Sequence, residues 1–277
     1  MMLKHIQSRT VLTLCAAALL VANGPAQDGA RDPDNPTCPR EPNWAGDKDM
    51  TLTVGTVKGD AIVAGDKPVY RFAPDASGRQ TDTGLEGFKI LLAEGIVDAG
   101  VPERLEKVIK AHPDIDEIWV RSPGGDARAG NAAGLMIRKQ LGLRKDGNFI
   151  VTRIPSGWAC FSACNFVFMG GDIRIVEEGG HFMVHMFTST GDRDAIDYSV
   201  AMGTDSTIEL IGDIEQESAL LATEDNDFLI RMGVSRRLLS EVMYRQKAVK
   251  TEDDKSTRYC LSVAEAREYN VANGVAE

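Results

Sequence analysis

An alternation of strand-like and helix-like segments in the middle of this chain restricts its fold more than any other feature of the sequence. Residues 88–93 and 115–120 are apolar runs typical of buried strands, and residues 101–111 between them carry apolar side chains at helical spacing. A helical pattern follows at residues 129–141, and another apolar strand at residues 148–154. Because strands that alternate with helices form parallel βαβ units, the sequence predicts an α/β fold with a parallel sheet.

Two consecutive strand ends in this region carry residue types suited to chemistry. The second strand runs into Ser122-Pro123-Gly124-Gly125, where two glycines allow backbone N–H groups to approach a ligand closely. The next strand leads to Ser162, which stands between two cysteines before an apolar helical segment. A serine at a strand-to-helix turn lies beside unpaired N–H groups, which stabilise the negative charge that develops in acyl transfer. Ser162 is therefore the candidate nucleophile.

A serine needs a base to act as a nucleophile, and His185 is the best placed histidine. His5 lies in a segment that we expect to be removed, and His112 precedes a proline in a polar linker. His181 and His185 share the strand-like run HFMVHMF, and His185 lies nearer its carboxyl end, where α/β sheets assemble their sites. On a strand the two imidazoles start roughly 13 Å apart, too far to hold one metal ion. The sequence therefore predicts neither a metal site nor a cofactor.

The first 26 residues have the three-part layout of a secretory signal peptide. Lys4 and Arg9 precede an apolar run at residues 11–22, and small residues follow up to Ala26, after which we expect cleavage. The sequence thus predicts a periplasmic or secreted protein. No second run is long enough to span a bilayer, so no membrane insertion is expected once the signal peptide is removed.

The balance of charge argues against one class of partner. The chain carries a formal net charge of −10, which becomes −12 when Lys4 and Arg9 leave with the signal peptide. Nucleic acids and anionic membranes bind basic surfaces, so neither is expected as a partner.

Four cysteines remain after removal of the signal peptide, namely Cys38, Cys160, Cys164 and Cys260. In an oxidising compartment they can form two disulfide bonds, in three connectivities that the sequence does not distinguish. A bond from Cys160 or Cys164 would fix the turn that carries Ser162.

Composition divides the chain into four segments. They are a signal peptide at residues 1–26, a flexible leader rich in Asp, Pro, Asn and Gly at 27–49, a short β segment at 50–84, and an α/β domain at 85–277. Within the α/β domain, residues 188–232 read as a helical insertion after the histidine strand. Ser262 and Glu265 have the spacing of a capping box, which predicts the start of a closing helix.

Short motifs of the α/β domain follow one another in a recognisable order. They are Ser122-Pro123-Gly124-Gly125 after a strand, Gly130 with Ile137-Arg138, Ser162-Ala163, Gly170-Gly171 with Arg174, Met183-Val184-His185, and Leu261-Ser262-Val263-Ala264-Glu265-Ala266 with Glu268-Tyr269. In this order they resemble the Clp protease proteolytic subunit and its relatives in the ClpP/crotonase superfamily, over residues 88–272. The cysteine-flanked serine is most similar to periplasmic relatives of that family.

The resemblance implies a fold, an activity and a set of site residues. The fold would be a spiral of ββα units, with the helical insertion as the handle through which copies of the chain associate. Ser162 would be the nucleophile, His185 the general base, and the N–H groups of Gly125 and Ala163 the oxyanion hole. The activity would be that of an exported serine peptidase, which cleaves peptides or unfolded proteins through an acyl-enzyme.

One position departs from the family pattern. The acid that orients the histidine precedes the Leu-Ser of the closing helix in the family, where this chain has Thr257 and Arg258. The third member therefore stays unassigned, with five alternatives: Asp213, Asp225, Asp227, Asp253 and Asp254. Without an acid the pair would be a weak dyad or a binding site. The second hypothesis is thus a catalytically weak or inactive binding or assembly protein of the cell envelope.

Two other chemistries fit the sequence less well. Action on acyl thioesters, found among crotonase relatives, needs coenzyme A, which belongs to the cytoplasm, whereas this chain is expected to be exported. A Ser-Lys mechanism needs a lysine, and none lies between Ser162 and His185 or close after them.

Overall fold

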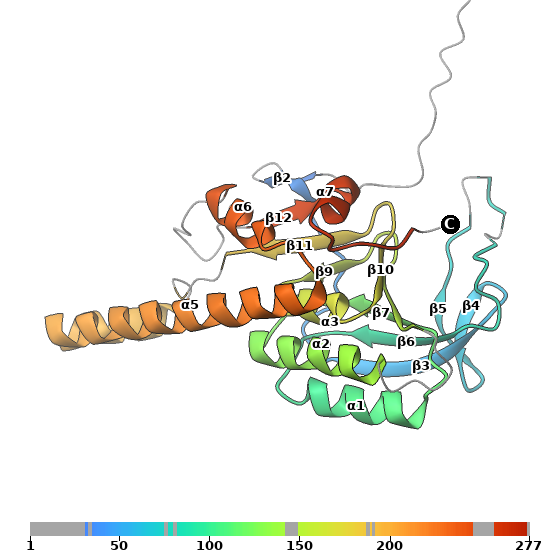
Figure 1. The fold of residues 1–277 in the computed structure, drawn as a ribbon, viewed down its shortest axis with the longest axis horizontal. Coiled ribbons are helices and arrows are strands. Elements are labelled where there is room, and N and C mark those ends of the chain that lie inside the picture. The colour runs from blue at the N-terminus through green and yellow to red at the C-terminus, as the bar shows by residue number, and fades with distance from the viewer. Residues whose placement is uncertain are drawn as a thin grey trace, which may run out of the picture.

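The structure is a computed structural model that describes residues 31–32, 35–74, 77–79, 82–141, 149–186, 189, 192–245 and 258–275. The signal peptide predicted at residues 1–26 lies outside the described residues, as do Asp253, Asp254 and Thr257. In the described part, an α/β body carries a long helical arm on one side (Figure 1), which confirms the predicted α/β class; the spiral of ββα units stays a prediction. None of the helices described combines the length and the apolar character needed to cross a bilayer.

Seven strands form the main sheet within the described residues: β3 Thr51–Lys58, β4 Ala61–Ala64, β5 Lys67–Arg71, β6 Lys89–Glu94, β7 Glu117–Arg121, β8 Val151–Ile154 and β10 Ile173–Val176. Their order across the sheet is β10-β8-β7-β6-β3-β4-β5. Strands β6, β7, β8 and β10, which are neighbours in this sheet, run parallel to one another, as predicted. Residues 50–84 extend the same sheet, because β3 pairs with β6 in antiparallel register and β4 and β5 follow it.

Helices α1 (Val101–Ala111) and α2 (Ala127–Leu141) pack side by side against the main sheet (Figure 1). A proline in the first turn of α1 suits a position where the backbone N–H has no helical partner. Val101, Leu105 and Ile109 lie on one face of α1 and are buried in the core. Burial of each such side chain contributes roughly 1.5–3 kcal/mol, so this face fixes the helix on the sheet.

A second sheet holds the candidate site. Among the described residues it contains β9 Ala159–Phe161, β11 His181–His185 and β12 Arg258–Leu261, in the order β12-β11-β9. Strand β11 runs parallel to β9 and antiparallel to β12. The short helix α3, Cys164–Met169, follows β9 and is buried along its whole length.

The strand that leads into Ser162 differs from the one that the sequence predicted. The apolar run at residues 148–154 was expected to lead directly to the serine, but β8 ends at Ile154 and Phe149 is 59% exposed. Pro155 cannot donate to a sheet, and Gly157, with a φ of 76°, turns the chain into β9 of the second sheet. The serine therefore follows β9.

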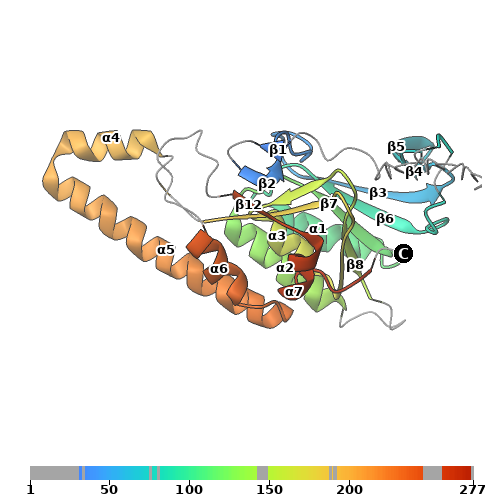
Figure 2. The ribbon, with the colours of Figure 1, turned by 90° about the horizontal axis from the view of Figure 1, so that it is seen from above.

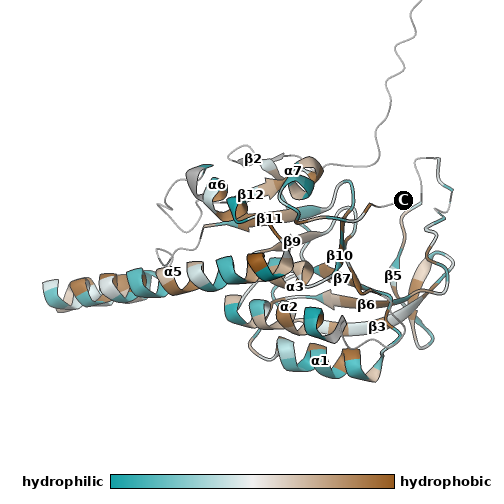
Figure 3. Cartoon of the chain, in the orientation of Figure 1, coloured by the Kyte–Doolittle hydropathy of each residue, from teal (hydrophilic) through white to brown (hydrophobic). Residues whose placement is uncertain are grey.

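The arm consists of two helices in the region predicted as a helical insertion. Helices α4 (Arg193–Met202) and α5 (Thr204–Met232) join at Gly203, and α4 folds back along the outer part of α5 (Figure 2). The arm mixes hydrophilic and hydrophobic positions along its length (Figure 3). Its exposed apolar side chains are Tyr198, Val200, Met202, Ile208, Ile211, Leu220 and Ile230. Association of copies through the arm stays a prediction.

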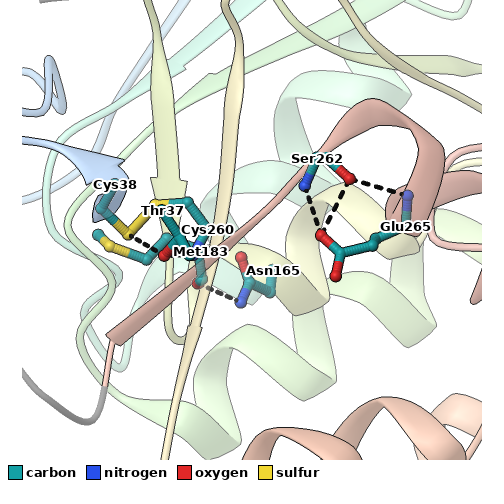
Figure 4. The surroundings of a disulfide bond; sticks show 7 residues. All are labelled: Thr37, Cys38, Asn165, Met183, Cys260, Ser262 and Glu265. Carbon is teal, nitrogen blue, oxygen red and sulfur yellow. Dashed lines mark hydrogen bonds between the residues drawn. A yellow bond between two sulfur atoms is a disulfide. The ribbon is translucent and has the colours of Figure 1, made fainter. Parts of the chain in front are cut away.

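The remaining elements close the fold at its two ends. Near the N-terminus, β1 (Arg31–Asp32) pairs with β2 (Asn35–Pro39). Helix α6 (Arg237–Arg245) follows α5, and α7 (Val263–Glu268) begins with the predicted capping box of Ser262 and Glu265 (Figure 4), which is confirmed. Arg174, part of one sequence motif, is buried and donates to the carbonyls of Gly171, Asn270 and Val271. That motif residue therefore fastens the C-terminal segment to β10.

Candidate active site

The side chains of Ser162 and His185 meet in the structure. Oγ of Ser162 lies 2.8 Å from Nε2 of His185, although the residues are 23 positions apart in the chain. Ser162 stands between β9 and α3, and His185 ends β11, the neighbour of β9. Strand pairing thus places a hydroxyl and an imidazole at the distance that a nucleophile and its base require.

The turn that carries Ser162 has a strained backbone. The φ of Ser162 is 57°, in the left-handed region that costs a residue other than glycine about 1–2 kcal/mol. A disulfide bond between Cys160 and Cys164 closes around the serine, and both cysteines are fully buried. Strain of this kind persists only where the surroundings hold it, and it is frequent at functional sites.

Two hydrogen bonds tie this turn to β11. The N–H of Ser162 donates to the carbonyl of Met183 at 3.4 Å. Nδ2 of Asn165 donates to the same carbonyl at 2.9 Å (Figure 4), and Asn165 is 5% exposed. Its Oδ1 makes no hydrogen bond within the part of the chain that the structure describes. The carbonyl of Met183 therefore fixes the spacing between the serine turn and the histidine strand.

The loop of Gly124 and Gly125 lies directly against the serine. A Cβ on Gly124 would come 2.5 Å from the Cβ of Ser162, and one on Gly125 would come 2.2 Å from the carbonyl oxygen of Val97. The φ angles of the two glycines are 103° and 141°, which side-chain-bearing residues rarely adopt. Only glycine fits either position, so the close approach predicted from the sequence is present.

Gly125 and Ala163, whose N–H groups are the predicted oxyanion hole, belong to two segments that meet at Ser162. Val97 bonds to the loop on either side of Gly125, since its N–H donates to Gly124 and its carbonyl accepts from Asp126. Neither Gly125 nor Ala163 donates its N–H to an acceptor among the residues described. Ala163 caps α3, where N–H groups lack helical partners. Two unpaired donors thus belong to segments that flank Ser162, as an oxyanion hole requires.

The second ring nitrogen of His185 is bonded to a backbone carbonyl. Nδ1 lies 3.0 Å from the carbonyl oxygen of Met186. A carbonyl only accepts hydrogen bonds, so the neutral imidazole carries its proton on Nδ1, which leaves the lone pair of Nε2 facing the hydroxyl of Ser162. This is the tautomer that a general base needs. Nothing in the sequence pointed to Met186, because a backbone oxygen leaves no signal in a side-chain pattern.

No carboxylate in the described part of the chain bonds to His185. Asp213, Asp225 and Asp227, which were alternatives for the third member, all lie on α5 and make no hydrogen bond or ion pair with the histidine. Burial, together with the charge of Glu224, raises the pKa of Asp225 to about 6. Within the residues described, the third partner of the pair is therefore the carbonyl of Met186.

Arg258 brings a positive charge close to the histidine. The antiparallel register of β11 and β12 pairs it directly with His185. Burial lowers the pKa of His185 below its ordinary value of 6.5, the hydrogen bond to Met186 works in the opposite direction, and the charge of Arg258 lowers the pKa further. The net effect keeps the imidazole neutral and able to accept a proton.

The structure selects one of the three disulfide connectivities that the sequence left open. Cys38 pairs with Cys260, 222 positions away, and Cys160 pairs with Cys164, four positions away. The first bond ties the leader to β12 (Figure 4), and the second surrounds Ser162.

The other two histidines in the described part of the chain lie away from the pair. His181 begins β11 at the end opposite His185, and His112 is exposed after α1. In the described ranges, no three His, Cys, Asp or Glu side chains gather as a metal site would require. The absence of a metal or cofactor stays a prediction.

Comparison with known proteins adds little to this geometry. No protein-family description matches the chain. No curated protein matches it either. Among solved structures, a mutant of ClpP1 from Listeria monocytogenes is similar, with 17% sequence identity and a TM-score of 0.42, over 66% of this chain and 88% of that one. The functional proposal therefore rests on the geometry around Ser162.

Proposed function

We propose that this chain is a serine peptidase-like hydrolase that cleaves peptides or unfolded proteins. The observation that carries the proposal is the 2.8 Å contact between Oγ of Ser162 and Nε2 of His185. The strained serine turn and the two unpaired N–H groups beside it add support, because acyl transfer needs both an accessible nucleophile and an oxyanion hole. The motif order that resembles the ClpP/crotonase superfamily and its ββα spiral points the same way.

Each proposed step uses a group already in position. Nε2 of His185 takes the proton of Ser162 as Oγ attacks the substrate carbonyl, and the N–H groups of Gly125 and Ala163 stabilise the oxyanion. The imidazolium then protonates the leaving amine, which departs and leaves the acyl group on Oγ. Water then attacks the ester while His185 takes its proton; the acyl group leaves as a carboxylic acid, and the imidazolium returns the proton to Oγ of Ser162.

A catalytically weak or inactive binding protein is the second candidate, and the surroundings of the histidine favour it. A carboxylate would stabilise the imidazolium that forms during the reaction, whereas the carbonyl of Met186 is neutral. The positive charge of Arg258 opposes the imidazolium. In this second case the site would bind peptides without turning them over.

We also propose that the protein acts outside the cytoplasm, either in the periplasm or as a secreted protein. Disulfide bonds persist in oxidising compartments and are rare in the cytosol, and the described residues contain two of them. The signal-like layout of residues 1–26 supports the same location.

Labelling with a fluorophosphonate distinguishes an enzyme from a binder, because only an activated serine attacks the phosphorus atom. We expect the wild-type chain to take up one label. Trypsin should release it on the peptide of residues 154–174, which contains both Ser156 and Ser162. Fragmentation in a mass spectrometer should place the label on Ser162. An unlabelled wild-type protein, or a label on Ser156, would remove the case for a peptidase.

The pH dependence of labelling provides a second prediction. The imidazole must be neutral to act as a base, and the pKa of His185 is lowered from 6.5, chiefly by burial. The labelling rate should therefore rise with pH to a plateau, with a midpoint below 6.5. In the Arg258→Met variant the midpoint should move upward, because a positive charge that disfavours the imidazolium has been removed. A wild-type midpoint above 6.5 would contradict the burial of an uncharged base.

A further inference from the structure

Residues 37–44 of the leader are fastened at one edge of the second sheet. Cys38 forms the disulfide bond with Cys260 on β12 (Figure 4). The N–H of Cys260 also donates to Oγ1 of Thr37 at 3.2 Å. The start of this leader segment is therefore held on β12, the strand next to β11.

The same segment is fastened again at the opposite edge of that sheet. The N–H of Ala159 on β9 donates to the carbonyl of Asn43 at 2.9 Å, and Arg121 donates to Oδ1 of Asn43 at 3.0 Å. Because β11 lies between β12 and β9, the leader crosses the strand that ends in His185.

This crossing ends in an aromatic pair next to the proposed catalytic residues. The rings of Trp44 and Phe161 are stacked, with centroids 6.2 Å apart and planes 16° apart. Phe161 directly precedes Ser162, and its ring centroid lies 4.7 Å from that of the His185 imidazole. Trp44 and Phe161, both half-buried, are called here the leader shelf.

The two rings of the leader shelf pack against buried side chains. Cys38, Met183 and Cys260 form a small buried cluster separate from the main core, and both aromatic rings pack against it. Ala45, directly after Trp44, has a φ of 66°, a conformation that alanine adopts only when its surroundings impose it. The shelf is thus preorganised, which lowers the cost of ordering it when a ligand binds.

We propose that the leader shelf binds a large apolar side chain of the peptide substrate close to the scissile bond. The identification of the ligand as a substrate rests on the proposed function. The shelf presents half-buried aromatic surface that adjoins both the nucleophile and the base, and a large apolar side chain gains by leaving water against such a surface. The leader, through its disulfide bond, therefore sets the specificity of the site.

Binding to a chain that cannot turn substrate over tests this proposal. The Ser162→Ala variant is titrated with two fluorescein-labelled, alanine-rich peptides that differ only in carrying phenylalanine or alanine at one central position, and fluorescence anisotropy is recorded. The phenylalanine peptide should bind at least about tenfold more tightly. Adding Trp44→Ala should abolish this preference, whereas adding Trp44→Phe, which keeps an aromatic ring, should retain most of it. Asp47→Ala, an exposed position of the same leader, is the matched control and should leave the preference unchanged.

Equal binding of the two peptides to the Ser162→Ala chain would overturn the proposal, as would a preference that survives Trp44→Ala or an absence of binding. Phosphonate labelling of the wild-type chain reports separately on the proposed function. If the wild-type chain is labelled but its Ser162→Ala form shows no preference for phenylalanine, only the leader-shelf proposal is refuted. If the wild-type chain is not labelled but its Ser162→Ala form shows a preference that depends on Trp44, only the peptidase proposal is refuted.

Discussion

The Ser162→Ala chain should take up no fluorophosphonate, and the His185→Gln chain should take it up about 10²- to 10⁴-fold more slowly than wild type. The first change removes the attacking oxygen. The second leaves an amide that can still hydrogen-bond to Oγ, 2.8 Å away in the native pair, but cannot accept its proton. Both rates can be followed by gel fluorescence or by the mass of the intact protein.

A second serine in the same region serves as the control for this experiment. Ser156 is exposed, lies six positions before Ser162 and has no contact with His185, so Ser156→Ala should label at the wild-type rate. Circular dichroism of each variant establishes that the fold is retained. A His185→Gln chain that labels as fast as wild type would show that the imidazole is not the base, whatever its distance from the serine.

Of the two disulfide bonds, the one between Cys38 and Cys260 should matter more for stability, and the one between Cys160 and Cys164 should matter more for activity. Removing the bond between Cys38 and Cys260, which are 222 positions apart, should lower the free energy of unfolding by about 4–5 kcal/mol, because it closes a long loop of the unfolded chain. Removing the bond between Cys160 and Cys164, four positions apart, should cost about 2 kcal/mol. The measurement is urea unfolding of the two double cysteine-to-alanine variants beside wild type.

In phosphonate labelling, the variant that loses less stability should show the larger loss of rate. The bond between Cys160 and Cys164 surrounds Ser162, whose left-handed backbone needs support, so its loss should slow labelling more than loss of the longer-range bond. Labelling is measured without urea, on variants whose circular dichroism matches that of wild type. If the variant lacking the longer-range bond labels more slowly, the short bond does not position the nucleophile.

Much of the fold and the central pair could be predicted from local sequence signals. The strand and helix rhythm from residue 88 onward predicted the parallel part of the sheet and placed α1 at its observed bounds, Val101–Ala111. The spacing of Ser262 and Glu265 predicted the start of α7. Ser162 and His185 were singled out because their residue types and positions at strand ends suit acyl transfer, and the structure brings them together.

Other parts of the site carried no local signal. The apolar run before Pro155 was taken as the strand that leads into Ser162, but the short strand β9 takes that place, since three residues are too few for periodicity to reveal. The partner of Nδ1 of His185 is the carbonyl of Met186, and every residue has a carbonyl. Trp44 in a polar leader gave no sign that it would stack on Phe161.

The sequence by itself determined the alternation of elements, the glycines that allow close approach and the residue types available for chemistry, because these depend on neighbours a few positions apart. The tertiary structure decided which cysteines pair, which atom orients His185, and that the leader lies over β11. These contacts depend on how β9, β11 and β12 pair and in which register. Register is set by the packing of the whole sheet, and residues as distant as Thr37 and Cys260 meet only once that packing is complete.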